Sequence, residues 1–102
     1  MKLPEWLILW VWQSLIGEIY PEIRAIVLRY DSKNNLLIRY YLDREPIEED
    51  YDSLECVVTN VLAHTSSNDE IKDVKEEAFY SSVRLTDLDI LDGLVYARKE
   101  YT

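Results

Sequence analysis

The chain contains one cysteine and one histidine, the side chains that most often serve nucleophilic or metal chemistry. Cys56 and His64 lie eight residues apart in one predicted helix, a separation of about 12 Å along the helix axis. That distance is too long for a hydrogen-bonded thiol–imidazole pair. We therefore expect Cys56 to be a small core residue and His64 to be a capping cation at the end of the helix.

Other catalytic and cofactor patterns are also missing from the sequence. No Cys-x-x-Cys or His-x-x-x-His spacing suits zinc, and no ladder of acidic residues matches a calcium loop. Asp87, Asp89 and Asp92 are better explained as a solvated turn than as a cation site. The only glycines, Gly17 and Gly93, cannot form a phosphate-binding loop. We expect no catalytic residue, no metal and no cofactor, and favour a binding protein over an enzyme.

Acidic residues outnumber basic residues by 20 to 11, which gives a formal net charge of −9. Such a surface repels nucleic acid and anionic membranes, because phosphate contacts need Lys or Arg. It attracts basic proteins, although acidity can also serve solubility alone, and charge by itself does not separate these two readings. The acidic residues gather in two clusters: Glu45, Glu48, Glu49, Asp50, Asp52 and Glu55, and then Asp69, Glu70, Asp73, Glu76 and Glu77.

The first element expected to position these residues is an N-terminal helix. Pro4 and Glu5 suit its first turn, and it should run to about Ile16, with Gly17 near its end. Its apolar residues extend almost all the way round, so we expect a sheet and a loop to bury it, with burial by a partner as the alternative. The apolar run 6–12 is far shorter than the roughly 20 residues that span a bilayer. It also lacks the flanking features of a signal peptide.

A β-hairpin follows. The runs 24–30 and 36–43 are rich in β-branched and aromatic residues, and the turn 31–35 between them contains residues that tolerate left-handed backbone. Alternation assigns one face to the core, with Ile26, Leu28, Tyr30, Leu36, Ile38, Tyr40 and Leu42. The other face carries Val27, Arg29, Leu37, Arg39 and Tyr41. We expect that face to be half covered by the Trp-rich helix or partly open to a ligand.

A second helix should begin at about Pro46 and close near residues 65–69. Its expected core residues are Tyr51, Leu54, Val58, Val61 and Leu62, and its expected water-facing stripe is Glu48, Asp52, Glu55 and Thr59. Residues 71–80 fit a helix or a strand, and their context favours a third strand. Residues 85–93 indicate a turn or short helical piece before a closing strand at 94–100. We predict one α+β domain over residues 1–102, with two main helices on a small antiparallel sheet in the order α-β-β-α-β-β.

Three stretches of the chain resemble small bacterial immunity proteins of polymorphic toxin systems. They are WQSLIGEIYPEIRAI at 12–26, RYYLDREPIEEDYDSLECVVTNVLA at 39–63 and LDGLVYARKEY at 91–101. The group includes the immunity partners of contact-dependent growth inhibition systems and of colicin-like nucleases. The resemblance implies a small, acidic, cytoplasmic protein that binds the toxin domain encoded beside it, and the lone cysteine fits a reducing cytoplasm as well.

If the resemblance holds, the expected mechanism is occlusion of a basic toxin cleft, with a nuclease as the expected toxin. Carboxylates would occupy the positions of phosphates, and aromatic side chains would exclude water around them. The expected partner-binding residues are Glu48, Glu49, Asp52 and Glu55, with Tyr41 or Tyr51 as anchors. We expect no direct contact with nucleic acid or membrane. The alternatives are a generic assembly module, homodimeric through Trp6 and Trp10, or an enzyme whose cleft would be lined by converging carboxylates.

Overall fold

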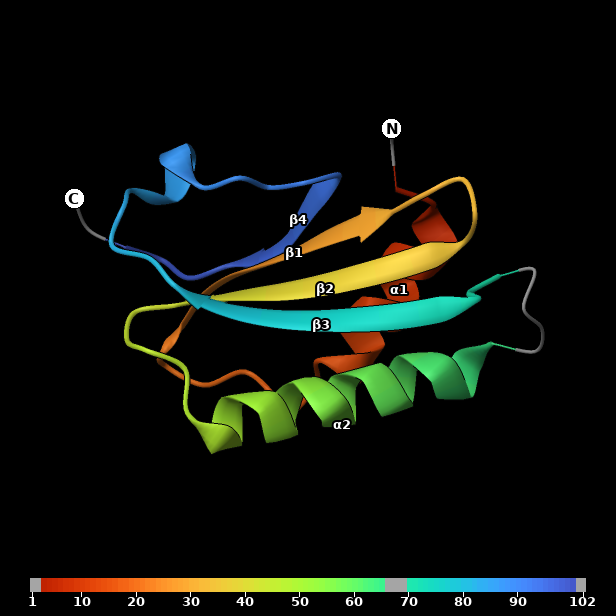
Figure 1. Ribbon diagram of the computed structural model, residues 1–102, viewed down its shortest axis with the longest axis horizontal. Helices are drawn as coiled ribbons and strands as arrows, with labels where there is room; N and C mark the ends of the chain where they lie inside the picture. The colour runs from red at the N-terminus through yellow and green to blue at the C-terminus, as the bar shows by residue number, and fades with distance from the viewer. Residues whose placement is uncertain (1–2, 66–69, 101–102) are drawn as a thin grey trace.

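The computed structural model describes residues 3–65 and 70–100, which form two helices packed against a four-stranded sheet (Figure 1). The elements along the chain are α1 (Glu5–Ser14), β1 (Ile23–Tyr30), β2 (Asn35–Leu42), α2 (Glu48–His64), β3 (Asp73–Tyr80), the 3-10 turn η1 (Leu85–Asp87) and β4 (Gly93–Ala97). The predicted α+β class is confirmed, as is the strand assignment of the ambiguous run before Tyr80. In the hairpin turn, Asn34 adopts the left-handed backbone with φ of 65°.

The sheet is mixed, so the prediction of an antiparallel sheet is wrong for one strand pair. Its strand order is β3-β2-β1-β4, in which β1 is antiparallel to both neighbours and β2 is parallel to β3. The cause is the helix between them. The 17 residues of α2 span about 25 Å, close to the length of an eight-residue strand. The helix therefore returns the chain to the end where β2 began, and β3 must run parallel to β2.

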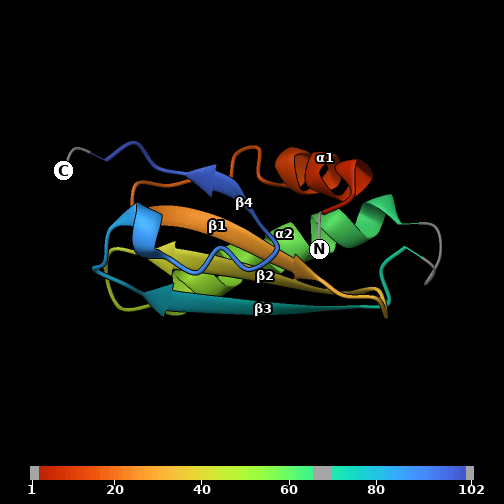
Figure 2. The same ribbon diagram turned by 90° about the horizontal axis from the view of Figure 1, so that it is seen from above.

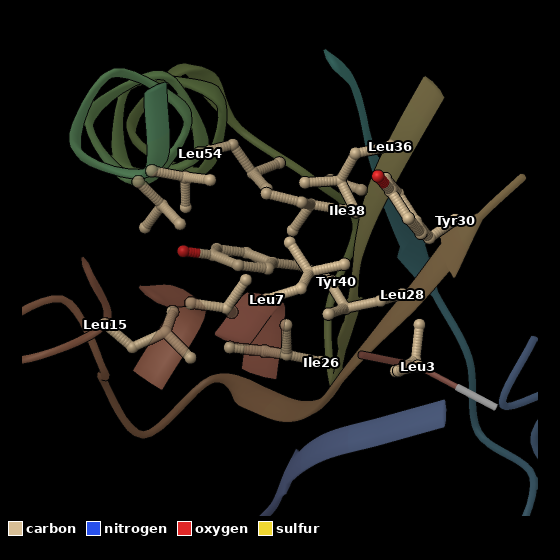
Figure 3. Packing of buried hydrophobic residues seen from close by; sticks show 14 of the residues in the cluster. Leu3, Leu7, Leu15, Ile26, Leu28, Tyr30, Leu36, Ile38, Tyr40 and Leu54 are labelled. Carbon is tan, nitrogen blue, oxygen red and sulfur yellow. The ribbon is translucent and has the colours of Figure 1, made fainter. Parts of the chain in front are cut away.

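Both helices cover one face of the sheet and bury the main core. Leu7 from α1 and Leu54 from α2 point toward Tyr40 and Ile38 of β2, as Figure 3 shows. Every hairpin residue assigned to the core by alternation is buried, from Ile26 through to Leu42. The helical spacing in α2 was predicted less well. Leu54, Val57 and Val61 are its buried apolar residues, whereas the predicted core residues Tyr51 and Leu62 are exposed.

The other sheet face is covered at one end, but not by the Trp-rich helix, which was one of the two arrangements expected. Val27 and Tyr41 are buried there beneath Leu85, Leu88 and Leu91. In Figure 2 the segment that contains η1 passes in front of β1 and β2, whereas α2 lies behind them. The rest of this face carries exposed Arg29 and half-buried Leu37 and Arg39. Arg39 pairs with Glu77 of β3 at 2.8 Å.

Helix α1 is not buried on all sides, which corrects the expectation drawn from its apolar residues. Leu7 and Val11 are buried, and Trp6 and Trp10 are partly buried against the core. On the outer side, 54% of Trp12 is exposed, and Leu9 and the following Ile16 are exposed beside it. The helix ends at Ser14, two residues before the predicted end, and Gly17 in the turn that follows takes a left-handed φ of 83° that other residues rarely adopt. Within the described residues, no helix is both long and apolar enough to cross a membrane.

A cluster of ion pairs fastens the C-terminal segment to the sheet. Arg24 is buried on β1 and donates from Nε and Nη2 to the two carboxylate oxygens of Glu100, each at 2.8 Å. Arg98 also donates to Glu100 and reaches Asp43 beyond β2 at 2.7 Å. The guanidinium of Arg24 lowers the pKa of Glu100 to about 2, with Arg98 adding to the effect. This bidentate geometry is the strong form of an Arg–carboxylate contact.

Candidate functional site

The N-terminal end of α2 is held against the loop 15–22 by one buried carboxylate, Asp50. Tyr20 of the loop donates a 2.5 Å hydrogen bond to Asp50. Arg44 donates to both carboxylate oxygens, and the backbone N–H of Ile47 donates at 2.8 Å. Burial acts to raise the pKa of Asp50, but the hydrogen bonds from Arg44 and Tyr20 outweigh it and lower the pKa. The carboxylate thus remains charged and fixes the spacing between loop and helix.

That spacing leaves an open groove of about 580 Å³ between the loop and the N-terminal half of α2. Figure 1 shows the orange loop after α1 running beside this part of the helix. The groove has four acidic lining residues, Glu18, Glu22, Glu49 and Asp52, and one basic lining residue, Arg44. Since Arg44 already pairs with Asp50 at 2.6 Å, the charged side chains that line the groove have a net negative charge. We call these eleven lining residues and the space between them the acidic groove: Gly17, Glu18, Ile19, Tyr20, Glu22, Arg44, Ile47, Glu49, Asp52, Ser53 and Cys56.

Negative charge continues along α2 toward its C-terminal half. A second hollow, adjoining the first, is lined by Glu18, Asp52 and Glu55 together with uncharged residues of α2. Beyond Glu55 lies Glu76 of β3, whose pKa is raised by burial and further by the Glu55 carboxylate. The two acidic clusters of the sequence therefore meet at this point. They do not merge fully, because Glu77 points to the other face of the sheet, where it pairs with Arg39, and Asp69 lies outside the described residues.

The predicted partner-binding residues divide into two groups in space. Glu48, Glu49, Asp52 and Glu55 are all exposed on α2, and Tyr51 beside them is 47% exposed. Tyr41 lies away from them, on the opposite face of the sheet, and is only 6% exposed. Its hydroxyl donates to the backbone oxygen of Asp89 at 2.7 Å. Tyr41 thus supports the segment before β4, whereas Tyr51 is exposed on α2 without lining the acidic groove, whose aromatic lining residue is Tyr20.

Of the residues considered for other chemistry, Cys56 has different surroundings from those expected, whereas His64 lies where it was predicted. Cys56 is exposed and lines the acidic groove, so the expectation of a core cysteine is wrong. His64 is in the last turn of α2, as predicted, and its ring stacks on Trp10 at 5.6 Å between centroids. Asp89 and Asp92 accept backbone hydrogen bonds from Leu91 and Tyr30. Within residues 3–65 and 70–100, no three His, Cys, Asp or Glu side chains are grouped to hold a metal ion.

Sequence reasoning missed Glu18 and Glu22, which form the wall of the groove opposite α2. Both follow Gly17, at the point where α1 ends and the chain turns toward β1. Their distance from the helix cluster in the sequence concealed the fact that they face it. The nearest signal was the Gly17 stop, which predicts a loop after α1 but not the element that its acidic residues face.

Among known protein families, the model described as MafI2 immunity protein matches residues 4–100. The chain belongs to the MafI2 immunity protein family. Membership makes it an immunity protein of a polymorphic toxin system, whose partner is a toxin. A comparison of the sequence with curated proteins found no significant match.

Proposed function

We propose that this MafI2 immunity protein neutralises a nuclease toxin by covering the basic active site of the toxin with the acidic groove. The observation that carries the proposal is the concentration of negative charge in one groove. Glu18 and Glu22 on the loop face Glu49 and Asp52 on α2 across it. A nuclease cleft is basic because it must hold phosphates. Carboxylates at phosphate positions would compete with nucleic acid and speed association.

The proposal includes the setting expected from the resemblance. The protein would act in the cytoplasm as a binding protein without catalytic activity, in a contact-dependent growth inhibition or colicin-like system. The toxin domain encoded beside this chain would degrade RNA or DNA when purified alone, and an equimolar amount of the immunity protein would stop the reaction. A toxin domain that kills cells without degrading nucleic acid would refute the nuclease part.

Charge reversal tests the acidic side of α2, where Glu49 and Asp52 line the acidic groove and Glu55 lines the adjoining hollow. Glu48, Glu49, Asp52 and Glu55 are replaced by lysine singly and together, and the affinity for a catalytically inactive toxin domain is measured by calorimetry. We expect at least one variant to lose tenfold or more in affinity, about 1.4 kcal/mol, and the loss to shrink as salt screens the charges. Asp87→Lys is the matched control, because Asp87 is exposed in η1 and does not line the groove. Equal affinities for all variants would show that another face binds.

A second candidate function is assembly through α1, and the exposed stripe of Leu9, Trp12 and Ile16 favours it. Trp6 and Trp10, the residues expected in such a dimer, make internal contacts with Tyr30 and His64. A dimer would therefore use the outer stripe of α1. Sedimentation of the free protein at micromolar concentration distinguishes the cases, since a monomer removes this candidate.

A further inference from the structure

An apolar hollow of about 320 Å³ lies between the end of α1 and β4. Its lining side chains are Trp12, Leu15, Ile16, Ile19, Val95 and Tyr96. The indole N–H of Trp12 donates to the backbone oxygen of Val95 at 2.9 Å, which fixes one wall across the two elements. Ile16 on the rim is 80% exposed. Burial of such apolar surface in a complex is favourable at about 25 cal/mol per Å², so this hollow fits a large apolar side chain of a partner.

The apolar hollow adjoins the acidic groove. Gly17 and Ile19 line both, so the loop that ends α1 has an acidic wall on one side and an apolar wall on the other. Glu18 stands between them in the sequence and lines the groove. A partner segment that crosses this loop would meet both surfaces at once. An apolar anchor beside a charged rim is the usual composition of an interface whose few central residues carry most of the affinity.

Charge decides between a second copy of the chain and a basic partner. A two-fold contact through the hollow would bring the Glu18 side chains and groove rims of two copies together, each on a chain of net charge −9. Like charges placed opposite each other cost free energy. A basic partner has the opposite sign and gains from the same arrangement. The surroundings of the hollow therefore favour a basic partner.

We propose that the apolar hollow between α1 and β4 binds a large apolar side chain of the toxin, next to the basic toxin residues that occupy the acidic groove. This inference rests on the proposed function and extends its interface from α2 around the loop to α1. The toxin segment would carry an apolar residue adjacent to Lys or Arg. The acidic groove would raise the rate of association and the specificity for a basic partner, and the hollow would lower the rate of dissociation.

The test removes apolar surface from the rim without disturbing the fold. The variant Ile16→Ser, at a residue that lines the hollow and not the groove, is compared with Ile90→Ser, a control of the same residue type that is 47% exposed and lines neither hollow nor groove. Affinity for the inactive toxin domain is measured beside Glu49→Lys/Asp52→Lys, and thermal unfolding confirms that each variant is folded. We expect Ile16→Ser to bind at least tenfold more weakly, mainly through faster dissociation, and Ile90→Ser to bind normally.

Each other result overturns a defined part of the reasoning. Normal binding by the serine variant with weak binding by the lysine variant refutes the hollow and leaves the proposed function standing. Normal binding by both refutes the hollow and the groove together. If Ile90→Ser lowers the affinity for the toxin domain by the same factor, the effect comes from a general loss of apolar surface, and the hollow is refuted as a specific site. A free protein that is dimeric, and that Ile16→Ser makes monomeric, assigns the hollow to a second copy and refutes the proposed occupant.

Discussion

Replacing Asp50 by asparagine tests whether one buried carboxylate holds the acidic groove together. Asp50 is fully buried and accepts hydrogen bonds from Arg44, from the Tyr20 hydroxyl and from the Ile47 backbone. Asparagine has nearly the same shape, and its amide oxygen still accepts a hydrogen bond. What it removes is the negative charge opposite Arg44 and near the positive end of the α2 dipole.

The magnitude follows from the surroundings of the two partners. A hydrogen bond to a charged group contributes about 1.5–3 kcal/mol, and the carboxylate at the helix start adds roughly 0.3–1 kcal/mol. Complete breakage of a buried ion pair costs about 3–5 kcal/mol, because a charge is stranded. The side chain of Arg44 is 33% exposed and returns to water, so the cost should stay below that range. We expect Asp50→Asn to lower the free energy of unfolding by about 2–3 kcal/mol.

Urea unfolding at neutral pH measures this loss. Asp52→Asn is the matched control, since Asp52 is two residues away on the same helix and exposed, and its change should stay within about 0.5 kcal/mol. A double-mutant cycle with Arg44→Gln should give a coupling energy above about 1 kcal/mol. Because the pKa of Asp50 is lowered in the folded protein, its contribution is present at neutral pH and disappears as pH falls through that pKa. A loss for Asp50→Asn no larger than for Asp52→Asn would refute the reasoning.

Two further predictions concern the C-terminal ion pairs and the groove thiol. The pKa of Glu100 falls from 4.5 to about 2 on folding, so its stabilisation of the folded protein is complete above pH 4.5 and is lost as pH falls toward 2. The shift limits this stabilisation to about 3 kcal/mol. Because solvent screens the ion pairs, we expect Glu100→Gln to cost about 1–2 kcal/mol at neutral pH. Thermal unfolding from pH 7 to 3 should show Glu100→Gln and the unmodified protein converging, and a constant gap would contradict this. The sole thiol, Cys56, is exposed in the groove, so it should react readily with Ellman's reagent in the free protein and at least tenfold more slowly in the toxin complex. An unchanged rate would place the toxin elsewhere.

The elements that were predicted correctly are those whose signals are local. The hairpin was defined by two alternating runs around a turn, and its core face required only a period of two, which Ile38 and Tyr40 obey. The parallel direction of β3 was missed because it depends on the length and path of α2, a relation between three elements. The cover of the Tyr41 face was missed for a related reason, since Leu85, Leu88 and Leu91 come from an irregular segment without a periodic pattern.

The candidate site shows the same division between local and long-range information. The acidic residues of α2 could be assigned to one water-facing stripe, because helical spacing alone puts Glu48, Asp52 and Glu55 there. Their counterpart on the loop could not, since Glu18 and Asp52 lie together only through the long-range contact in which Tyr20 donates to the buried Asp50. The apolar residues of α1 were ambiguous in the same way. An all-round apolar helix of ten residues predicts cover on several sides, yet Trp12 and Ile16 remain exposed. Exposed apolar side chains beside concentrated charge are typical of a protein-binding surface. In a protein whose partner is a toxin, the unexpected exposure of Trp12 and Ile16 therefore favours a role for these residues in toxin binding.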